Sequence, residues 1–399
     1  MSGRCVVTLN AGSSSIKFSL IEETPGGLAP LAVGLAEMAG EKRRLTIKDG
    51  AGEVMHRAER DEDPAAPFHA EALRRILAWR QSAFPDANVV AAGHRVVHGG
   101  VNHAAPVIVT DAVLAELKTL IPLAPLHQPY NLAGIVGARE AWPHVTQVAC
   151  FDTAFHRDHP YVNDTFALPR EFYDEGVRRY GFHGLSYEYI TRKLREVAPL
   201  YAAGRVVVAH LGNGASMCAI RDGHSIASSM GFTALDGLPM GTRCGQLDPG
   251  VVLYLMQEKG MSAEEVADLL YKRSGLLGLS GLSNDMRELL ASDDPQAQRA
   301  LEYFVFRIRR EFGGLAAVLK GIDAIVFCGG IGEHAWQVRE RVLEGMEWIG
   351  VELDRVANRA DAQVISSERS RARVFVIPTD EEGMLARHAL ALLDGAASA

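Results

Sequence analysis

The sequence predicts an α/β protein built from two related halves. Strand-like and helix-like segments alternate along its 399 residues, a pattern that favours sheets covered by helices. A chain of this length is expected to hold two or three domains. The apolar run before a small-residue turn at 10–17 is echoed about half a chain later, before a second turn at 212–216. The echo suggests that each half opens with the same strand–turn–strand unit.

The first of these turns is the most informative segment. Residues 10–17, N-A-G-S-S-S-I-K, lie between one apolar run and an alternating run that reaches Ile21, which predicts a strand, a tight turn and a second strand. Backbone N–H groups and hydroxyls gathered in one small space, beside a lysine, suit a polyphosphate. The segment is not a P-loop, because G-x-x-x-x-G-K-[ST] is absent. An ordinary serine-rich hairpin is the alternative.

The bulk composition argues against several classes of protein. The formal net charge of −8 argues against nucleic acid or an anionic membrane as a main partner. No apolar run approaches the length of a membrane span, and the first one is too short for a signal peptide. The five cysteines are scattered without a C-x-x-C pair, which argues against a zinc site or a disulfide framework. A reducing cytoplasm is therefore expected.

Periodicity and capping residues place several helices. The expected helices are residues 69–83, a segment after the cap pair Thr110 and Asp111, a segment capped by Ser186, a segment opened by the capping box at 262–265, and residues 295–320 as the longest. A further capping box is expected between Thr379 and Glu382. The clearest seam between domains is expected at 142–150.

Several further segments combine arginine or acid with glycine. They are 93–100 (G-H-R-V-V-H-G-G), 178–184 (R-R-Y-G-F-H-G), 240–245 (M-G-T-R-C-G) and 326–334 (V-F-C-G-G-I-G-E-H). Arginine presents a planar fork that matches a carboxylate or a phosphate, and glycine lets backbone approach a ligand closely. The last segment is expected to be a strand that runs into a glycine turn, with a helix after it. A structural arginine held by an ion pair is the alternative for the first segment.

Asp152 follows the apolar run 148–151, so it is expected at the carboxyl end of a strand, where α/β sheets bind ligands. A turn cap is the alternative. With the phosphate turns and arginines, and without a nucleophilic triad, the residues favour phosphoryl transfer, which needs positioning and positive charge more than covalent chemistry.

These motifs resemble the acetate kinase family over nearly the whole chain, from Leu9 to about Leu393. The matching segments, in order, are 10–17, 93–100, 151–156, 180–184, 210–216, 240–245 and 329–333. The resemblance implies an α/β, two-domain, actin-like ATPase (ribonuclease H-like) fold with a duplicated βββαβαβα core and an interdomain active-site cleft. The implied N-terminal domain is 1–150, completed by a C-terminal helix near 384–399. The implied C-terminal domain, 151–383, carries most of the nucleotide site.

The resemblance also implies a reaction. A cytoplasmic homodimer of this family makes acetyl phosphate and ADP from acetate and ATP, reversibly, with Mg²⁺ or Mn²⁺ (EC 2.7.2.1). The implied partners are these small molecules, with no nucleic acid and no membrane.

Residue roles follow from the same resemblance. Asn10 and Glu381 would hold the metal, Arg95 would bind the acetate carboxylate, and Val97, Leu126 and Phe182 would form the acyl pocket. Asp152 would be the catalytic carboxylate, with His183 and Arg243 stabilising the transition state. The ATP site would consist of Lys17, His210, Leu211, Gly212, Asn213, Gly214, Asp285, Met286, Arg287, Gly330, Ile331, Gly332, Glu333 and His334.

The chemistry of the acceptor, a carboxylic acid, narrows the role expected for Asp152. A carboxylic acid is already ionised at neutral pH, so no general base is needed to create the nucleophile. Asp152 is therefore expected to orient an arginine, a histidine or the substrate, and not to remove a proton. Arg95, Arg243 and His183 would supply the field that brings two anions together.

Three positions depart from the family's common pattern. Ala234 stands where proline is common, which could loosen the acyl pocket and admit propionate. His334 and Asp380 stand where asparagine is common, which is expected to alter purine contacts and the charge near the metal. The alternatives are a kinase for propionate or another short-chain carboxylate, an actin-like ATP-binding scaffold, and a sugar kinase, which would need a catalytic base.

Overall fold

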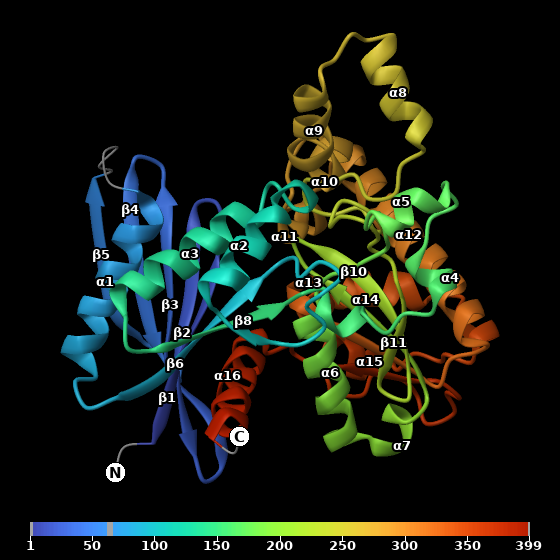
Figure 1. The fold of residues 1–399 in the computed structure, drawn as a ribbon. Helices are drawn as coiled ribbons and strands as arrows, with labels where there is room; N and C mark the ends of the chain where they lie inside the picture. Colours follow the sequence, from blue (N-terminus) through green and yellow to red (C-terminus); the bar gives the residue numbers. More distant parts are fainter. Residues whose placement is uncertain (1–2, 62–66, 398–399) are drawn as a thin grey trace. The chain divides into compact units, whose positions relative to one another are not determined.

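The computed structural model describes residues 3–61 and 67–397, which form a mixed α/β fold (Figure 1). The chain separates into two compact units. Unit 1 consists of Met1–Ala154 with Asp380–Ala399, and unit 2 is Phe155–Thr379. The domain bounds expected from the sequence, 1–150 with 384–399 and 151–383, stay a prediction, and their residues 1–2, 62–66 and 398–399 lie outside the described residues.

Unit 1 is built on an eight-stranded sheet with the order β5-β4-β3-β2-β1-β6-β8-β7. Its strands are β1 (Arg4–Ala11), β2 (Ser15–Thr24), β3 (Gly27–Ala39), β4 (Lys42–Asp49), β5 (Val54–Asp61), β6 (Asn88–Val96), β7 (Val107–Ile108) and β8 (Thr146–Phe151). Strands β1 and β2 pair antiparallel, and the Gly12 N–H donates to the Ser15 carbonyl at 2.8 Å to close their turn. The predicted opening hairpin is confirmed.

The helices of unit 1 are α1 (Phe68–Ala83), α2 (Asp111–Thr119), α3 (Gln128–Ala141) and α16 (Glu381–Ala397), with a 3-10 turn at Ile121–Leu123 and a second at Ala154–His156 where the units meet in sequence. The expected helices at 69–83 and after Thr110 are confirmed, and the Thr110 hydroxyl accepts from the Val113 N–H at 3.2 Å. Alternate side chains of β1, including Leu9, pack with α1 and α3 in one core cluster. Helix α16, red in Figure 1, packs on β1, β6 and β8.

Unit 2 is built on a five-stranded sheet with the order β11-β10-β9-β12-β13. Its strands are β9 (Arg205–Leu211), β10 (Ala215–Arg221), β11 (His224–Ser228), β12 (Ala324–Cys328) and β13 (Arg373–Val376). Strands β9, β10 and β11 form an antiparallel meander, whereas β9, β12 and β13 are parallel neighbours. In unit 1, β3-β2-β1-β6-β8 has the same order and the same directions. The internal echo of the sequence therefore reflects a duplicated sheet.

The helices of unit 2 are α4 (Tyr161–Asp164), α5 (Arg170–Asp174), α6 (Gly184–Val197), α7 (Pro199–Ala202), α8 (Pro249–Gln257), α9 (Ala263–Lys272), α10 (Gly275–Ser280), α11 (Met286–Ala291), α12 (Pro295–Leu319), α13 (Gly329–His334), α14 (Trp336–Leu343) and α15 (Arg355–Arg359), with a 3-10 turn at Glu347–Ile349. The capping box of α9 forms as expected, between Ser262 and Glu265. Helix α12, at 25 residues, is the longest in the described part of the chain, as predicted.

Two predicted caps are wrong. Ser186 lies inside α6, whose cap position is His183, because the Ser186 hydroxyl is hydrogen-bonded to His210 instead of to the helix backbone. The expected capping box of Thr379 and Glu382 is replaced by Asp380, whose carboxylate accepts from the Gly383 N–H at 2.8 Å. Asp380 thus serves as a helix cap.

The glycine segment after β12 also differs from expectation. Residues 329–334 form the short helix α13 instead of a turn. The Glu333 carboxylate accepts from the Gly329 N–H at 2.8 Å, and Gly329 has a φ of +74°, which glycine tolerates.

The helices of the described residues include none that is both long and apolar enough to cross a membrane.

Candidate active site

In unit 1, three parallel strands bring polar residues to one edge of the sheet. Strands β1, β6 and β8 are parallel neighbours, so their carboxyl ends lie at the same edge. Asn10 and Arg95 lie close to the ends of β1 and β6, and Asp152 directly follows β8. The position expected for Asp152 at the end of a strand is confirmed.

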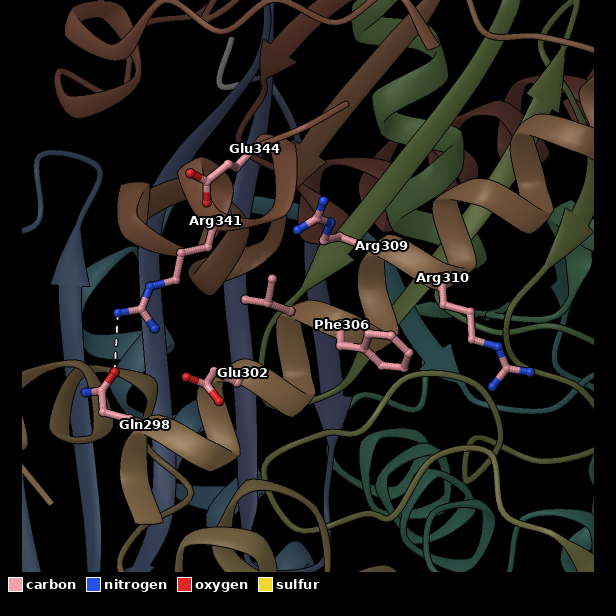
Figure 2. Close-up of a pocket in the computed structure, with 8 residues that line it drawn as sticks. Gln298, Glu302, Phe306, Arg309, Arg310, Arg341 and Glu344 are labelled. Atoms are coloured by element: carbon pink, nitrogen blue, oxygen red, sulfur yellow. Dashed lines mark hydrogen bonds between the residues drawn. The ribbon is translucent and has the colours of Figure 1, made fainter. Parts of the chain in front are cut away.

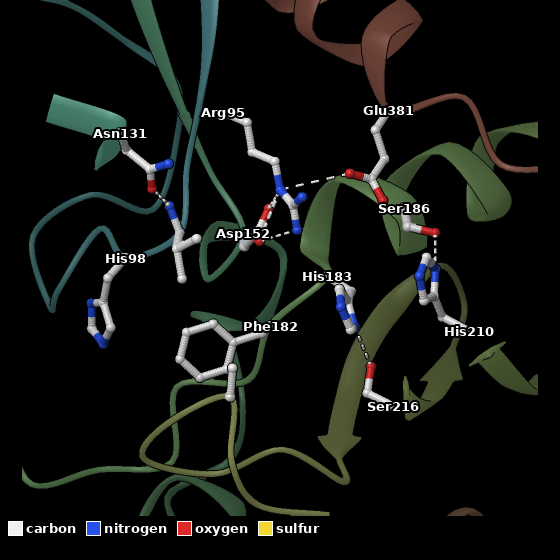
Figure 3. Close-up of polar contacts among 12 residues, drawn as sticks. Arg95, His98, Asn131, Asp152, Phe182, His183, Ser186, His210, Ser216 and Glu381 are labelled. Atoms are coloured by element: carbon white, nitrogen blue, oxygen red, sulfur yellow. Dashed lines mark hydrogen bonds and ion pairs between the residues drawn. The ribbon is translucent and has the colours of Figure 1, made fainter. Parts of the chain in front are cut away.

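Arg95 and Asp152 form a two-pronged ion pair at this edge. The Arg95 Nε donates to both Asp152 oxygens at 3.0 and 3.1 Å, and Nη2 donates to Oδ2 at 2.8 Å. The Asp152 side chain is only 2% exposed, against 20% for Arg95. Figure 3 shows the Glu381 carboxylate on the other side of the guanidinium, 3.7 Å from Nε. Burial disfavours the charged form, but the charges of Asp152 and Glu381 outweigh it and raise the pKa of Arg95.

Asn131 of α3 joins the ends of two strands, and sequence reasoning assigned it no role. Its Oδ1 accepts from the Val97 N–H at 2.9 Å, and its Nδ2 donates to the Ala11 carbonyl at 2.8 Å. Gln128, one turn earlier on α3, holds both backbone groups of His98. Both side chains are buried. The motif at 93–100 is therefore attached to α3 through buried amides, which a serial inspection of the sequence could not reveal.

The remaining predicted residues of unit 1 differ in exposure. Lys17 is the cross-strand partner of Asn10 and is exposed, as Leu126 is, whereas Val97 is buried. Glu382 follows Glu381 at the start of α16, where burial, together with the charge of Glu381, raises its pKa.

In unit 2, the first turn of α6 contacts the β9–β10 pair. His210 and Ser216 are direct cross-strand partners. His183 Nδ1 lies 2.8 Å from the Ser216 hydroxyl, and the Ser186 hydroxyl lies 2.8 Å from His210 Nδ1, as Figure 3 shows. The two imidazole rings stack, with centroids 4.4 Å apart. His183 has a φ of +58°, a left-handed conformation that histidine adopts more readily than most side chains.

The turn between β9 and β10 is surrounded by these side chains. The Gly212 N–H donates to the Gly214 carbonyl at 3.0 Å. A Cβ atom at Gly214 would lie 2.9 Å from Arg243 Nη2 and 3.0 Å from His183 Nε2, so only glycine fits without displacing them. Arg243 is oriented by the Ala234 carbonyl, which accepts from its Nη1 at 2.6 Å. The structure thus brings Arg243, His183 and the predicted phosphate turn together.

The other predicted nucleotide residues of unit 2 belong to three further segments. Leu211 ends β9 and is buried, and Asn213 lies in the turn that follows it. Asp285 caps α11 and pairs with the exposed Arg287 at 2.5 Å, and this hydrogen bond lowers the pKa of Asp285 to about 2. Met286 is buried.

Helix α13 carries the last group of predicted nucleotide residues, from Gly330 through Ile331, Gly332 and Glu333 to His334. The Glu333 carboxylate is occupied by backbone, because besides Gly329 it accepts from the Thr379 N–H at 3.2 Å. His334 is exposed, with its Nε2 3.9 Å from Glu333.

A buried cluster supports the loop before α6. His156 is hydrogen-bonded through Nε2 to the Phe182 carbonyl at 3.0 Å and through Nδ1 to the Ser225 hydroxyl at 2.7 Å. His159 is hydrogen-bonded to the same hydroxyl at 2.7 Å. Because Phe182 precedes His183, this cluster fixes the backbone that carries both predicted residues. The sequence motif at 151–156 contained His156 but did not indicate this role.

A cavity of about 660 Å³ lies elsewhere in unit 2, on α12 and α14 (Figure 2). Its lining residues are Gln298, Glu302, Val305, Phe306, Arg309, Arg310, Arg341 and Glu344. None of the residues predicted for the active site lines it.

The predicted metal ligands fit a magnesium ion that is carried on a nucleotide. The described residues contain no cluster of three or more histidine, cysteine, aspartate or glutamate side chains suited to a metal. Mg²⁺ commonly takes one or two protein oxygens and completes its shell with phosphates and water. The amide of Asn10 and the carboxylate of Glu381 are donors of this kind.

Comparison with known proteins identifies relatives over the full length. The Acetokinase family model matches residues 5–387. The chain is 79% identical to the acetate kinase of Methylocella silvestris, over 99% of this chain and 100% of that protein. It is similar to the solved structure of Porphyromonas gingivalis acetate kinase (TM-score 0.88, 37% identity, 98% of this chain and 100% of that chain). It is also similar to that of a propionate kinase from Francisella tularensis (TM-score 0.90, 35% identity, with the same coverage).

The buried histidines predict a loss of stability in acid. Burial lowers the pKa of His94 and of His156 from 6.5 to about 4. The folded state keeps both rings neutral, whereas the unfolded chain protonates them below pH 6.5. The stability they contribute is therefore complete above pH 6.5 and is lost as the pH falls toward 4, by roughly 3 kcal/mol for each ring. Urea unfolding midpoints, measured between about pH 7 and pH 4, test this loss of stability.

The variant His156→Gln removes one of these titrations, so its midpoint should fall less steeply with pH than that of the wild type. The exposed His224 offers a matched control, and His224→Gln should leave the slope unchanged. Equal slopes for His156→Gln and wild type would contradict the assignment.

Proposed function

Because the chain belongs to the acetokinase family, we propose that it transfers the terminal phosphoryl group of ATP to acetate, giving acetyl phosphate and ADP, and that it catalyses the reverse reaction. The observation that carries this proposal is the 79% identity to an acetate kinase along 99% of the chain. The geometry of the two units supplies groups suited to both halves of the reaction.

The acceptor side of the reaction is proposed to use unit 1. The guanidinium of Arg95 would bind the acetate carboxylate, and the buried Asp152 holds that guanidinium in one orientation through three hydrogen bonds. Val97, Leu126 and Phe182 would form the acyl pocket. Acetate is ionised at neutral pH, so its oxygen attacks without a general base.

The donor side is proposed to use unit 2. Arg243 and His183 face the turn at Gly212–Gly214 and would stabilise the negative charge of the phosphoryl group in flight. An acetate oxygen forms a bond to the γ-phosphorus while the bond to the β–γ bridging oxygen breaks, in line. Asn10 and Glu381 would hold Mg²⁺, which when bound neutralises charge on the nucleotide phosphates.

The nucleotide itself is proposed to contact the residues that the family resemblance implies. They are Lys17, His210, Leu211, Gly212, Asn213, Gly214, Asp285, Met286, Arg287, Gly330, Ile331, Gly332, Glu333 and His334. We also propose a cytoplasmic homodimer. Five free cysteines, four of them buried, suit a reducing compartment.

A propionate kinase is the second candidate, because a solved propionate kinase is similar to this chain at a TM-score of 0.90. The deciding experiment traps acyl phosphate with hydroxylamine and compares kcat/KM for acetate, propionate and butyrate. We expect acetate to give the highest kcat/KM. One added methylene, as in propionate, should lower kcat/KM by at most about 10- to 200-fold. A higher value for propionate would favour the second candidate. No acyl phosphate from any of these acids would favour an actin-like ATP-binding scaffold.

The variant Asp152→Asn separates orientation from proton transfer. A neutral amide holds the Arg95 fork less firmly, so we expect kcat/KM for acetate to fall by about 10- to 100-fold. The shape of the pH–rate profile should stay that of the wild type, because no proton is removed. The exposed neighbour Asp158, changed to Asn, is the control and should retain wild-type rates. Loss of an acid limb in Asp152→Asn alone would identify a base.

The variant Arg243→Ala tests the transition-state role of the arginine beside the phosphate turn. We expect kcat to fall by about 10²- to 10³-fold with a smaller change in KM, because the lost interaction is strongest as charge moves. Arg273→Ala, an exposed arginine paired with Asp268, should have near-normal kcat. Near-normal kcat in Arg243→Ala would remove Arg243 from the mechanism.

A further inference from the structure

Tyr187 and Ser216 form a buried chain of hydroxyls that ends on His183. The Tyr187 hydroxyl lies 2.5 Å from the Ser216 hydroxyl, which lies 2.8 Å from His183 Nδ1. We propose that this chain is a positioning relay that fixes His183 as the neutral tautomer with its proton on Nε2, so that the ring donates a hydrogen bond to the transferred phosphoryl group. The role of that hydrogen bond rests on the proposed function, whereas the tautomer does not.

Local structure explains why these three residues meet. His183 occupies the cap position of α6 and Tyr187 lies four residues later, so both side chains lie on one face of the first turn. The Tyr187 N–H donates to the His183 carbonyl at 3.1 Å, which fixes their spacing. Ser216, on β10, lies against this face, and Tyr187 and Ser216 are both fully buried.

Hydrogen-bond accounting sets the direction of the relay. The Ser216 hydroxyl lies between two hydrogen-bond partners, His183 Nδ1 and the Tyr187 hydroxyl. The hydrogen bond of the Tyr187 hydroxyl is the one to Ser216. If Tyr187 donates to Ser216 and Ser216 donates to Nδ1, every proton has an acceptor. If Nδ1 carried a proton and donated to Ser216, Ser216 would donate to Tyr187 and the buried phenol proton would have no acceptor. A buried unpaired donor is costly, so the first direction is favoured.

Two further observations agree with this direction. Burial raises the pKa of Tyr187 well above its ordinary value, so the phenol keeps its proton and remains a donor. His183 also stacks on His210 with centroids 4.4 Å apart, and two imidazolium rings at that distance would repel each other. The Nδ1 atom of His210 likewise faces a hydroxyl, that of Ser186, which is linked to the Thr379 hydroxyl at 2.8 Å.

The other ring nitrogen of His183 points where a donor is useful. A Cβ atom on Gly214 would lie 3.0 Å from His183 Nε2, so Nε2 borders the turn proposed to bind phosphate. A proton on Nε2 can bind a phosphoryl oxygen. A lone pair there would instead oppose an approaching anion.

The tautomer is tested first in the wild-type protein, without reference to activity. ¹⁵N NMR of histidine-labelled protein, with the His183 signal assigned by His183→Gln, distinguishes a protonated from an unprotonated ring nitrogen. We expect unprotonated Nδ1 and protonated Nε2 near pH 7.5 (roughly one unit above the ordinary pKa). A proton on Nδ1 would overturn the relay.

Variants then test whether the relay determines the tautomer of His183. In Ser216→Ala the Nδ1 atom loses its donor, so we expect a mixture of tautomers and a fall in kcat of about tenfold. In Tyr187→Phe the Ser216 proton still has Nδ1 as its acceptor, so we expect the wild-type tautomer and a smaller fall in kcat. Ser216→Thr keeps a hydroxyl and should retain the wild-type tautomer, whereas Ser216→Ala should lose it. Tyr201→Phe is the matched control, because Tyr201 packs edge-on against Phe375 in the same unit.

The outcomes separate the two proposals. The expected NMR signature, in a wild-type protein that makes no acyl phosphate, would support the relay and overturn the proposed function. Acyl phosphate formation with a wild-type tautomer in Ser216→Ala would overturn the relay alone. Thermal melts and ATP affinity, compared with those of Tyr201→Phe, establish that the variants are folded.

Discussion

In each sheet, three neighbouring parallel strands end at the same edge, and the positions of the candidate groups depend on this constraint. In unit 1 the edge carries Arg95 and Asp152, and in unit 2 it carries His210 and the start of α13. Parallel strands can share such an edge only through long crossover connections, which here supply α3, α12 and the other covering helices. The connections therefore do more than cover the sheet, because α3 also provides the amide of Asn131 that joins two strand ends.

The two units hold their polar groups in different electrostatic states. Unit 1 keeps a full ion pair at the sheet edge, in which the buried carboxylate of Asp152 fixes the orientation of the Arg95 guanidinium. Unit 2 holds the stacked imidazoles of His183 and His210, and the Nδ1 atom of each ring faces a serine hydroxyl. Both arrangements orient donors before any ligand arrives, so little reorganisation is left for the reaction itself. The ion pair of Arg95 and Asp152 has a further consequence, because any anion that binds Arg95 shares the guanidinium with a carboxylate that is already bound to it.

Local signals were sufficient for the two opening hairpins and for several of the helices. Alternation and a small-residue turn predicted both hairpins, and a capping box predicted the start of α9. The same local logic was wrong for Ser186, because a serine near a helix start resembles a cap, and only the fold reveals that His210 lies beside it. Asn131 and Tyr187 were missed for the same reason: their partners lie on other elements, and no periodicity or spacing encodes a contact between distant segments. The polar groups that orient the candidate site residues are therefore harder to predict from the sequence than the site residues themselves.

The return of α16 to the first sheet has a consequence for synthesis on the ribosome. Strands β1, β6 and β8 are made early, yet the helix that covers them follows the whole of unit 2 in the chain. At about 5–20 residues per second, roughly 10 to 45 seconds pass between the two. During that interval the apolar face later occupied by α16 has no permanent cover, and the sequence of unit 2 is complete before α16 is made. Nascent chains of this protein are therefore expected to complete their second unit before their first, and to present a binding site for chaperones on the first sheet until α16 emerges.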